Sequence, residues 1–393
     1  MKRAAGILLA LLLTLPPLLL PTRAAGLEVA AKSAVLMDAA TGTVLYEANA
    51  HEPLAPASVT KVMTMLLIME ALDSGQITLN DTVTASEAAA AKGGSQIYLK
   101  VGETMPVSDM LKSIAVSSAN DCACAMAEHL WGSEGAFVEQ MNRRAAELGM
   151  ADTHFVNCTG LDDGADAVQH RTSAYDIALM SRELLTRHPD IKKFTTIWMD
   201  TVRGGTFGLS NTNKLIRFYP GATGLKTGFT SGAGYCLSAT AEREGMELIA
   251  VVMGCETSQK RTAACKSMLD YGFAGFALVQ PDLQTPVQVP VVLGKQGAVS
   301  LELAQPEGIL VEKGQRAKIQ FEPAQEPEVK APVEKGQVLG TLTVKSENQI
   351  IREIPLVASR AVERLKWSDL FLTALRRAAM AKPETPEAVP DNS

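Results

Sequence analysis

Apolar residues fill nearly every position of 62–69, directly after the sequence Pro-Ala-Ser-Val-Thr-Lys at 56–61. A helix that is hydrophobic on all sides is typical of the middle of a protein. Pro56 is unsuited to a helix interior but favours a helix start. The pattern therefore predicts a buried helix with Ser58 at its entrance and Lys61 one turn further along, on the same face.

Up to residue 278, some segments have the pattern of helices and others the pattern of strands. Helices are expected over 107–115, 122–131, 135–148, 172–185 and 257–278. Strands are expected over 33–38, 43–47, 221–229, 233–241 and 248–255, with tight turns joining the first pair and the last pair. Residues 80–104 show no clear period. The expected first domain, residues 27–279, is an α+β fold in which an antiparallel sheet accompanies a helical cluster.

After Pro281 the pattern changes to short β-type runs separated by Gly, Pro and Lys-Gly turns. The expected strands are 287–292, 299–303, 309–311, 317–321, 338–344 and 350–355. No helical period is visible in this stretch. It predicts a small all-β domain over residues 280–358, without a nucleophile and base of its own.

The two ends of the chain read differently. A charged start, an apolar run and small residues predict a signal peptide over residues 1–26. Residues 361–380 place cationic side chains on one helix face and apolar ones, including Trp367, on the other. That pattern predicts an amphipathic helix lying in a membrane surface, with docking onto the protein's own domain as the alternative. Residues 381–393 are expected to be disordered.

Composition narrows the classes of function. The chain has 393 residues and a formal net charge of −6, which gives no indication of nucleic-acid binding. Its six cysteines are scattered and show no metal-ligand spacing, so most are expected to be small buried thiols, and no metal or cofactor is expected. Five histidines, none within Gly-x-Ser-x-Gly, give little support for a Ser-His-Asp hydrolase.

The buried helix carries the first candidate chemistry. A hydroxyl at Ser58 meets the positive end of the helix dipole, and an amine at Lys61 can take its proton. Burial lowers the pKa of a lysine and makes the neutral amine a usable base. A helix cap followed by an ordinary lysine is the alternative, because Ser-x-x-Lys alone is a weak signal.

Two further segments complete a constellation for acyl transfer. Ser118 and Asn120 would supply a hydroxyl and an amide between two helices, although a helix break with an N-cap has the same sequence pattern. Lys226 and Thr227 would hold a carboxylate on an edge strand, and Gly228 would let a ligand backbone come close. An exposed strand end is the alternative for that triplet.

The ordered trio Ser-x-x-Lys, Ser-x-Asn and Lys-Thr-Gly is the signature of penicillin-binding proteins and class A β-lactamases. The chain resembles the low-molecular-weight penicillin-binding proteins that are D-alanyl-D-alanine carboxypeptidases. The resemblance extends to residues 34–38, 56–64, 157–161, 170–176, 211–215 and 223–228. The β domain and the amphipathic C-terminal segment are similar to that family in architecture.

The resemblance implies that Ser58 attacks the bond between two terminal D-alanines and that Lys61 accepts its proton. Ser118, with Lys226 as a further candidate, would relay a proton to the departing D-alanine. Asn120 would bind the substrate backbone, and Lys226 and Thr227 its terminal carboxylate. The backbone N–H groups of Ser58 and Phe229 would form the oxyanion hole. Family members often carry a polar residue where this chain has Phe229.

The resemblance also implies the partners and the location. They are peptidoglycan stem peptides ending in D-Ala-D-Ala, β-lactam antibiotics that acylate Ser58, and the outer face of the cytoplasmic membrane. A D,D-endopeptidase or transpeptidase would use the same residues. A β-lactamase would need a further glutamate, and no Glu-x-x-Leu-Asn lies between Asn120 and Lys226. A non-catalytic cell-wall scaffold would be indicated by loss of Ser58 or Lys61, and both are present.

Overall fold

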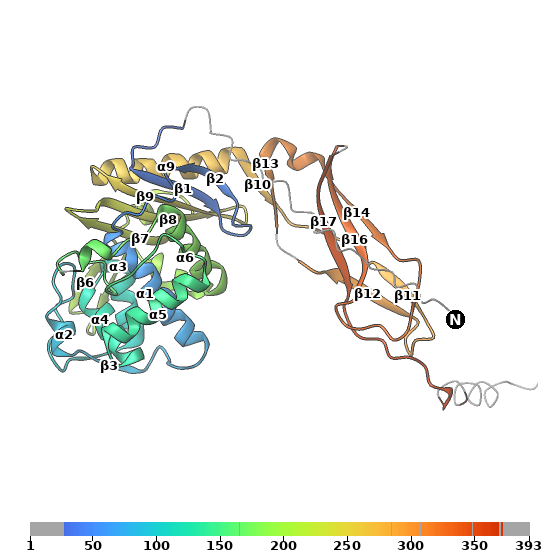
Figure 1. Cartoon of the computed structure of the whole chain (residues 1–393), viewed down its shortest axis with the longest axis horizontal. Helices are drawn as coiled ribbons and strands as arrows, with labels where there is room; N and C mark the ends of the chain where they lie inside the picture. Colours follow the sequence, from blue (N-terminus) through green and yellow to red (C-terminus); the bar gives the residue numbers. More distant parts are fainter. Residues whose placement is uncertain are drawn as a thin grey trace, which may run out of the picture. The chain divides into compact units, whose positions relative to one another are not determined.

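The computed structural model describes residues 27–368 and residue 371, except for residues 165, 284, 306–307 and 348. The described chain forms two compact units (Figure 1). One contains the chain up to Val279 together with Gly308–Gly314, and the other contains Gln280–Glu307 and the chain from Gln315 onward. The predicted signal peptide, most of the predicted amphipathic helix and the predicted tail lie outside the described residues.

A five-stranded antiparallel sheet is the framework of the first unit, with the spatial order β2-β1-β9-β8-β7. The strands are β2 (Val44–Ala48), β1 (Ser33–Asp38), β9 (Met246–Cys255), β8 (Gly234–Arg243) and β7 (Ala222–Thr230). All five were predicted within a few residues. Because β7 lies at the edge, some of its backbone N–H and carbonyl groups face away from any strand partner.

Both faces of this sheet are covered. In β1, Val35 and Met37 belong to one hydrophobic core, whereas Ala34 and Leu36 belong to a second core on the opposite face. Figure 1 shows α9 (Ser258–Gly275) along one face and the helical cluster against the other. Burial on both faces explains why these strands read as continuous apolar runs rather than as alternating patterns.

The predicted helical cluster is confirmed. Its helices are α1 (Lys61–Asp73), α3 (Val107–Ser117), α4 (Asn120–Trp131), α5 (Glu134–Glu147) and α6 (Ala174–Arg187). The helix α1 is buried along most of its length, as its apolar sequence predicted. The N-cap of α6 is Ser173, whose side chain accepts the Asp176 N–H at 3.1 Å.

Three expectations for the regular structure were wrong. Residues 80–104 contain three short elements, β3 (Thr82–Thr84), α2 (Glu87–Ala90) and β4 (Thr104–Pro106). The helix expected to reach residue 278 ends at Gly275, because Phe276–Val279 forms β10 and pairs with β13 (Ile309–Glu312). Since a short apolar run fits a helix end or a strand equally well, periodicity could not separate the two. That pairing also assigns β13 to the first unit rather than to the small β domain.

Short elements complete the first unit before α1, between α5 and α6, and between α6 and β7. They are η1 (Ala57–Thr60), η2 (Ala167–Gln169), η3 (Pro189–Ile191), α7 (Lys192–Thr195), β5 (Met199–Val202), β6 (Phe207–Ser210) and α8 (Leu215–Phe218).

The second unit is built on a six-stranded sheet with the order β14-β16-β17-β12-β11-β15. Its strands are β11 (Gln288–Val292), β12 (Ala298–Leu303), β14 (Ile319–Gln325), β15 (Val329–Lys330), β16 (Val338–Ser346) and β17 (Gln349–Ala358). The turn η4 (Lys313–Lys318) begins at the end of the first unit's second segment and continues into this one. Along β11, buried and exposed residues alternate, as expected for a sheet with one solvated face. The predicted all-β fold of this region is confirmed. The turn η4 and the two-residue strand β15 were not predicted.

Candidate active site

The turn that carries Ser58 leads directly into the buried helix α1. Ser58 lies in η1, and the Lys61 Nζ donates a hydrogen bond to the Ser58 Oγ at 3.0 Å. Neither η1 nor α1 has a side-chain cap. The alternative of a capping serine followed by an ordinary lysine is therefore wrong, because the Ser58 hydroxyl faces the amine and does not cap the helix.

Lys61 is held where a neutral amine is favoured. The residue is fully buried, and its Nζ donates a second hydrogen bond to the Thr159 carbonyl at 2.7 Å. Burial lowers the pKa of Lys61 to about 7, although attraction to Asp121 opposes part of that effect. Near neutral pH a large share of the Lys61 side chains therefore has a free lone pair beside the Ser58 hydroxyl.

The backbone just before the nucleophile is held in an unusual conformation. Ala57 has a φ of 48°, in the left-handed region that alanine rarely adopts. Its carbonyl accepts a hydrogen bond from the Thr60 Oγ1 at 2.8 Å. Gly160 packs against the same carbonyl so closely that a Cβ there would lie 1.8 Å from the oxygen. Position 160 therefore requires glycine if the turn is to keep this shape.

A buried histidine braces the same turn. The His170 Nδ1 accepts the Val156 N–H at 3.1 Å, so the proton of a neutral imidazole lies on Nε2. That Nε2 is 2.7 Å from the Thr60 Oγ1 and can donate to it. Burial lowers the pKa of His170 to about 4, which keeps the ring neutral. His170 thus positions Thr60 and does not touch the Ser58 hydroxyl.

Ser118 and Asn120 lie in the turn between α3 and α4. Ser118 ends α3 with a left-handed φ of 64°, and both side chains are buried. The residue before α4 is Ala119 and has no capping side chain, so Asn120 is not the N-cap that its sequence also allowed. The Asn120 Nδ2 donates to the Gly93 carbonyl at 2.7 Å. No hydrogen bond joins Ser118 to Ser58 or Lys61 in the described part of the chain.

The Lys-Thr-Gly triplet lies on the edge strand β7, and it is not an exposed strand end. Lys226 and Thr227 are buried. Burial lowers the pKa of Lys226 well below its ordinary value, and the charge of Lys61 lowers it further. A Cβ on Gly228 would lie 2.7 Å from the Pro56 carbonyl and 3.1 Å from the Ser58 nitrogen. The strand can approach the nucleophile this closely only because residue 228 has no side chain.

Thr212 joins the strand to the Ser-x-Asn turn. The Thr227 Oγ1 donates to the Thr212 Oγ1 at 2.7 Å. The Thr212 backbone N–H donates in turn to the Val116 carbonyl at 3.2 Å, two residues before Ser118. Thr212 therefore connects the strand that lies beside Ser58 to the turn that carries Ser118 and Asn120.

Phe229 is placed differently from the other candidates. About half of it is exposed, and its ring stacks on Tyr235, with the ring centroids 4.2 Å apart. Its side chain thus packs along the sheet edge. Its backbone N–H follows Gly228 directly on β7, the strand beside the Ser58 nitrogen.

A cluster that no sequence pattern predicted supports two of these contacts. The Glu134 carboxylate pairs with the Lys92 Nζ at 2.5 Å and accepts from both the backbone N–H and the Sγ of Cys158 at 3.2 Å. Burial raises the pKa of Glu134, but the bonds from Lys92 and Cys158 outweigh it and leave that pKa below its ordinary value. This Lys92–Glu134–Cys158 cluster fixes the loops whose next residues, Gly93 and Thr159, hold Asn120 and Lys61.

The remaining features concern cysteines, metals and membranes. All six cysteines are buried and free, as predicted. Among the described residues, no group of three His, Cys, Asp or Glu side chains is arranged to bind a metal ion. No helix in the described ranges combines the length and apolarity needed to cross a membrane.

Comparison with known families agrees with this geometry. Residues 21–257 match the family model of peptidase S11, described as D-alanyl-D-alanine carboxypeptidase. The chain belongs to the D-alanyl-D-alanine carboxypeptidase family. It is thus a serine-type peptidase, as the sequence predicted. Residues 278–364 match the C-terminal domain of penicillin-binding protein 5.

Individual relatives span most of the chain. The D-alanyl-D-alanine carboxypeptidase DacF of Bacillus subtilis is 46% identical over 353 residues, which are 88% of this chain and 88% of that relative. Penicillin-binding protein 5 of Haemophilus influenzae has a crystal structure that matches with a TM-score of 0.73 and 30% identity, covering 86% of this chain and 98% of that one. Penicillin-binding protein D2 of Listeria monocytogenes, in an ampicillin-bound form, matches with a TM-score of 0.55 and 31% identity, covering 63% of this chain and 99% of that one.

Proposed function

We propose that this carboxypeptidase removes the terminal D-alanine from peptidoglycan stem peptides that end in D-Ala-D-Ala, through an acyl-enzyme on Ser58. The observation that carries the proposal is the 3.0 Å contact between the Lys61 Nζ and the Ser58 Oγ, with the pKa of Lys61 lowered to about 7. A serine with a neutral amine at this distance has the arrangement of an activated nucleophile.

In the first step the Ser58 Oγ attacks the carbonyl carbon of the penultimate D-alanine while Lys61 takes the hydroxyl proton. The C–N bond then breaks, and the leaving amine of the last D-alanine receives a proton through Ser118, which gives up its hydroxyl proton and regains one from the Lys61 ammonium. Lys226 is a second candidate for this relay. Water finally attacks the ester, which releases the shortened peptide and restores the Ser58 hydroxyl. The burial of Ser118 and Lys226 supports a water-poor route for the proton.

Three contacts would orient the substrate. Lys226 and Thr227 would hold its terminal carboxylate, and Asn120 would bind its backbone. The backbone N–H groups of Ser58 and Phe229 would stabilise the oxyanion. The closeness of Gly228 to the Ser58 nitrogen supports this pairing, because it puts the two N–H groups on adjoining segments.

β-Lactam antibiotics would acylate the same serine. Their strained amide and their carboxylate resemble the reacting end of a D-Ala-D-Ala peptide, so the same groups would bind them. The ampicillin-bound form of the Listeria relative supports this extension. No metal or cofactor enters the proposed reaction.

The direct test is mass spectrometry of a pentapeptide muropeptide after incubation with the protein. The proposal predicts loss of one alanine. Joined peptides would instead indicate a transpeptidase, and cleavage of cross-linked dimers would indicate an endopeptidase.

We also propose that the protein is exported and held at the outer face of the cytoplasmic membrane by residues 361–380. The cationic and apolar faces of that segment support the proposal. Deletion of residues 361–393 should move the processed protein from the membrane pellet to the supernatant. Sedimentation that the deletion leaves unchanged would contradict this anchor.

A further inference from the structure

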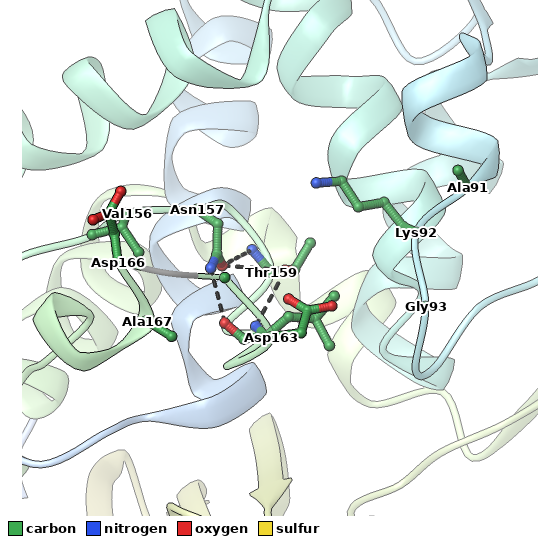
Figure 2. A pocket seen from close by; sticks show the side chains of 11 residues that line it. Ala91, Lys92, Gly93, Val156, Asn157, Thr159, Asp163, Asp166 and Ala167 are labelled. Carbon is green, nitrogen blue, oxygen red and sulfur yellow. Dashed lines mark hydrogen bonds between the residues drawn. The ribbon is translucent and has the colours of Figure 1, made fainter.

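A pocket of about 290 Å³ lies between two loops of the first unit, which contribute residues 91–93 and described residues from 156–164 and 166–167 (Figure 2). Its lining includes Lys92 and Gly93 on the first loop, and Thr159, Asp163 and Asp166 on the second. This volume is large enough for a long amino-acid side chain, although it is too small for a folded partner.

The pocket shares its walls with the catalytic groups. The carbonyl of its lining residue Gly93 accepts from the Asn120 Nδ2, and the carbonyl of Thr159 accepts from the Lys61 Nζ, both at 2.7 Å. The Asn120 Oδ1 is buried and has no hydrogen-bond partner among the described residues. A buried acceptor of this kind favours a ligand that supplies an N–H donor. A peptide that satisfied Asn120 would therefore pass beside the pocket.

Opposite charges line the two sides of the pocket. Figure 2 shows Lys92 on the first loop and Asp163 on the second, and both residues line the pocket. The ammonium of Lys92 uses one donor on Glu134, at 2.5 Å, and retains others. Asp163 and Asp166 are exposed, and the one hydrogen bond of the Asp166 carboxylate in the described ranges is a long one, 3.4 Å, from Gln169. A group with both an ammonium and a carboxylate matches this lining.

We propose that this pocket binds the side chain of the third residue of the stem peptide, and that it selects a diamino dicarboxylic acid there. This inference rests on the proposed function. The third residue directly precedes the D-Ala-D-Ala end, so its side chain is the first to extend beyond the reacting dipeptide. Its terminal ammonium would bind Asp163, with Asp166 nearby, and its terminal carboxylate would bind Lys92.

The test uses the full chain and three pentapeptides that differ only at the third residue. That residue is a diamino dicarboxylic acid, lysine, or norleucine, so the side chain carries both charges, the ammonium alone, or neither. The release of D-alanine gives kcat/KM for each peptide. The variants are Asp163→Asn and Lys92→Gln. Because Lys92→Gln leaves the Glu134 carboxylate without its ion-pair partner, the double variant Lys92→Gln/Glu134→Gln removes that charge as well. Glu139→Gln is the matched control, since Glu139 is an exposed carboxylate on α5 outside the pocket.

The unaltered protein should prefer the doubly charged peptide over the norleucine peptide by about five- to tenfold, since exposed charge pairs are modest in strength. Asp163→Asn should remove the advantage of the lysine peptide over the norleucine peptide. It should reduce but not abolish the advantage of the doubly charged peptide, whose carboxylate still binds Lys92. Lys92→Gln and the double variant should make the doubly charged peptide equal to the lysine peptide. Glu139→Gln should keep the original order of the three peptides.

Three results would overturn the inference. The first is an equal kcat/KM for all three peptides in the unaltered protein. The second is an equal fall in kcat/KM for all three peptides in the Asp163→Asn variant. The third is that the unaltered protein cleaves the lysine peptide as fast as the doubly charged one. In each case D-alanine release would still support the proposed function. If no peptide lost D-alanine and Ser58 were not acylated by penicillin, the proposed function itself would fail, and the inference with it.

Discussion

The two units differ in what they bury. All the buried polar and charged side chains among the described residues lie in the first unit, between Ser33 and Arg261. They include two lysines, Lys61 and Lys226. The buried residues of the second unit, such as Leu342 and Ile354, are apolar. Since burying an ammonium is costly, the first unit retains groups that stability alone would not favour, and they gather where the chemistry is proposed.

The difference between the two units indicates that the reaction depends on the first unit. In the second unit, an apolar core and alternating strands meet the requirements of a stable β fold. In the first unit the same requirements are broken at Ala57, Lys61 and Lys226, and specific neighbours compensate each time. Changes in the first unit should therefore alter acylation more than stability, and changes in the second should do the reverse.

Ser58→Ala should produce the largest effect, because it removes the atom that forms the ester. Covalent labelling by a fluorescent penicillin should disappear while the fold is kept. Ser74→Ala, which removes an exposed hydroxyl at the other end of α1, should label normally. Labelling of the Ser58→Ala protein would locate the nucleophile elsewhere.

Gly228→Ala should have the second-largest effect on acylation. The added Cβ would lie 2.7 Å from the Pro56 carbonyl and would push β7 away from the nucleophile turn. A shift of about 1 Å in such a site can lower the rate about 100-fold, so acylation should fall by up to that factor. Gly135→Ala is the control, because a Cβ there meets nothing within 4 Å. Similar acylation rates for both variants would show that close strand approach is unimportant.

Glu134→Gln should have an intermediate effect. It breaks the ion pair with Lys92 but leaves an oxygen that can still accept from the Cys158 N–H. The carbonyls of Gly93 and Thr159 would be held less firmly, and acylation should slow roughly three- to tenfold. Stopped-flow acylation would measure this, with Glu139→Gln on the same helix as the control. An acylation rate equal to that of the Glu139→Gln control would show that the Lys92–Glu134–Cys158 cluster does not support acylation.

Leu342→Ala should affect acylation least. Leu342 is fully buried on β16, so its truncation should destabilise the second unit by about 2–5 kcal/mol. Thermal unfolding should show that loss, while the rate of penicillin acylation below the transition stays unchanged. A matching fall in acylation would mean that the second unit supports the reaction directly.

Local spacing explains what the sequence could predict. Ser58 and Lys61 are three residues apart on one helical turn, so their contact followed from helix geometry, and the structure confirms it. The five strands of the first sheet were predicted from short apolar runs, and the cluster of helices from apolar positions at helical spacing, which are also local features. The catalytic roles of the trio remain proposals.

Long-range contacts explain what it could not predict. Lys61 is held by the carbonyl of Thr159, which lies 98 residues further along the chain, and Thr60 by His170, 110 residues away. A carbonyl has no sequence signature, and a lone histidine has no partner until the chain is folded. The need for glycine at position 160 could not be predicted either, because it depends on the Ala57 carbonyl that packs against Gly160 in the folded chain.

The central claim is that Lys61 works as a neutral base towards Ser58. The most direct test is the rate of Ser58 acylation by a penicillin from about pH 5 to about pH 9. Because the ammonium must lose its proton first, the rate should rise with pH and reach half its plateau near pH 7, the value to which burial lowers the pKa of Lys61. A rate that stays constant over this range, or falls as the pH rises through 7, would contradict the account.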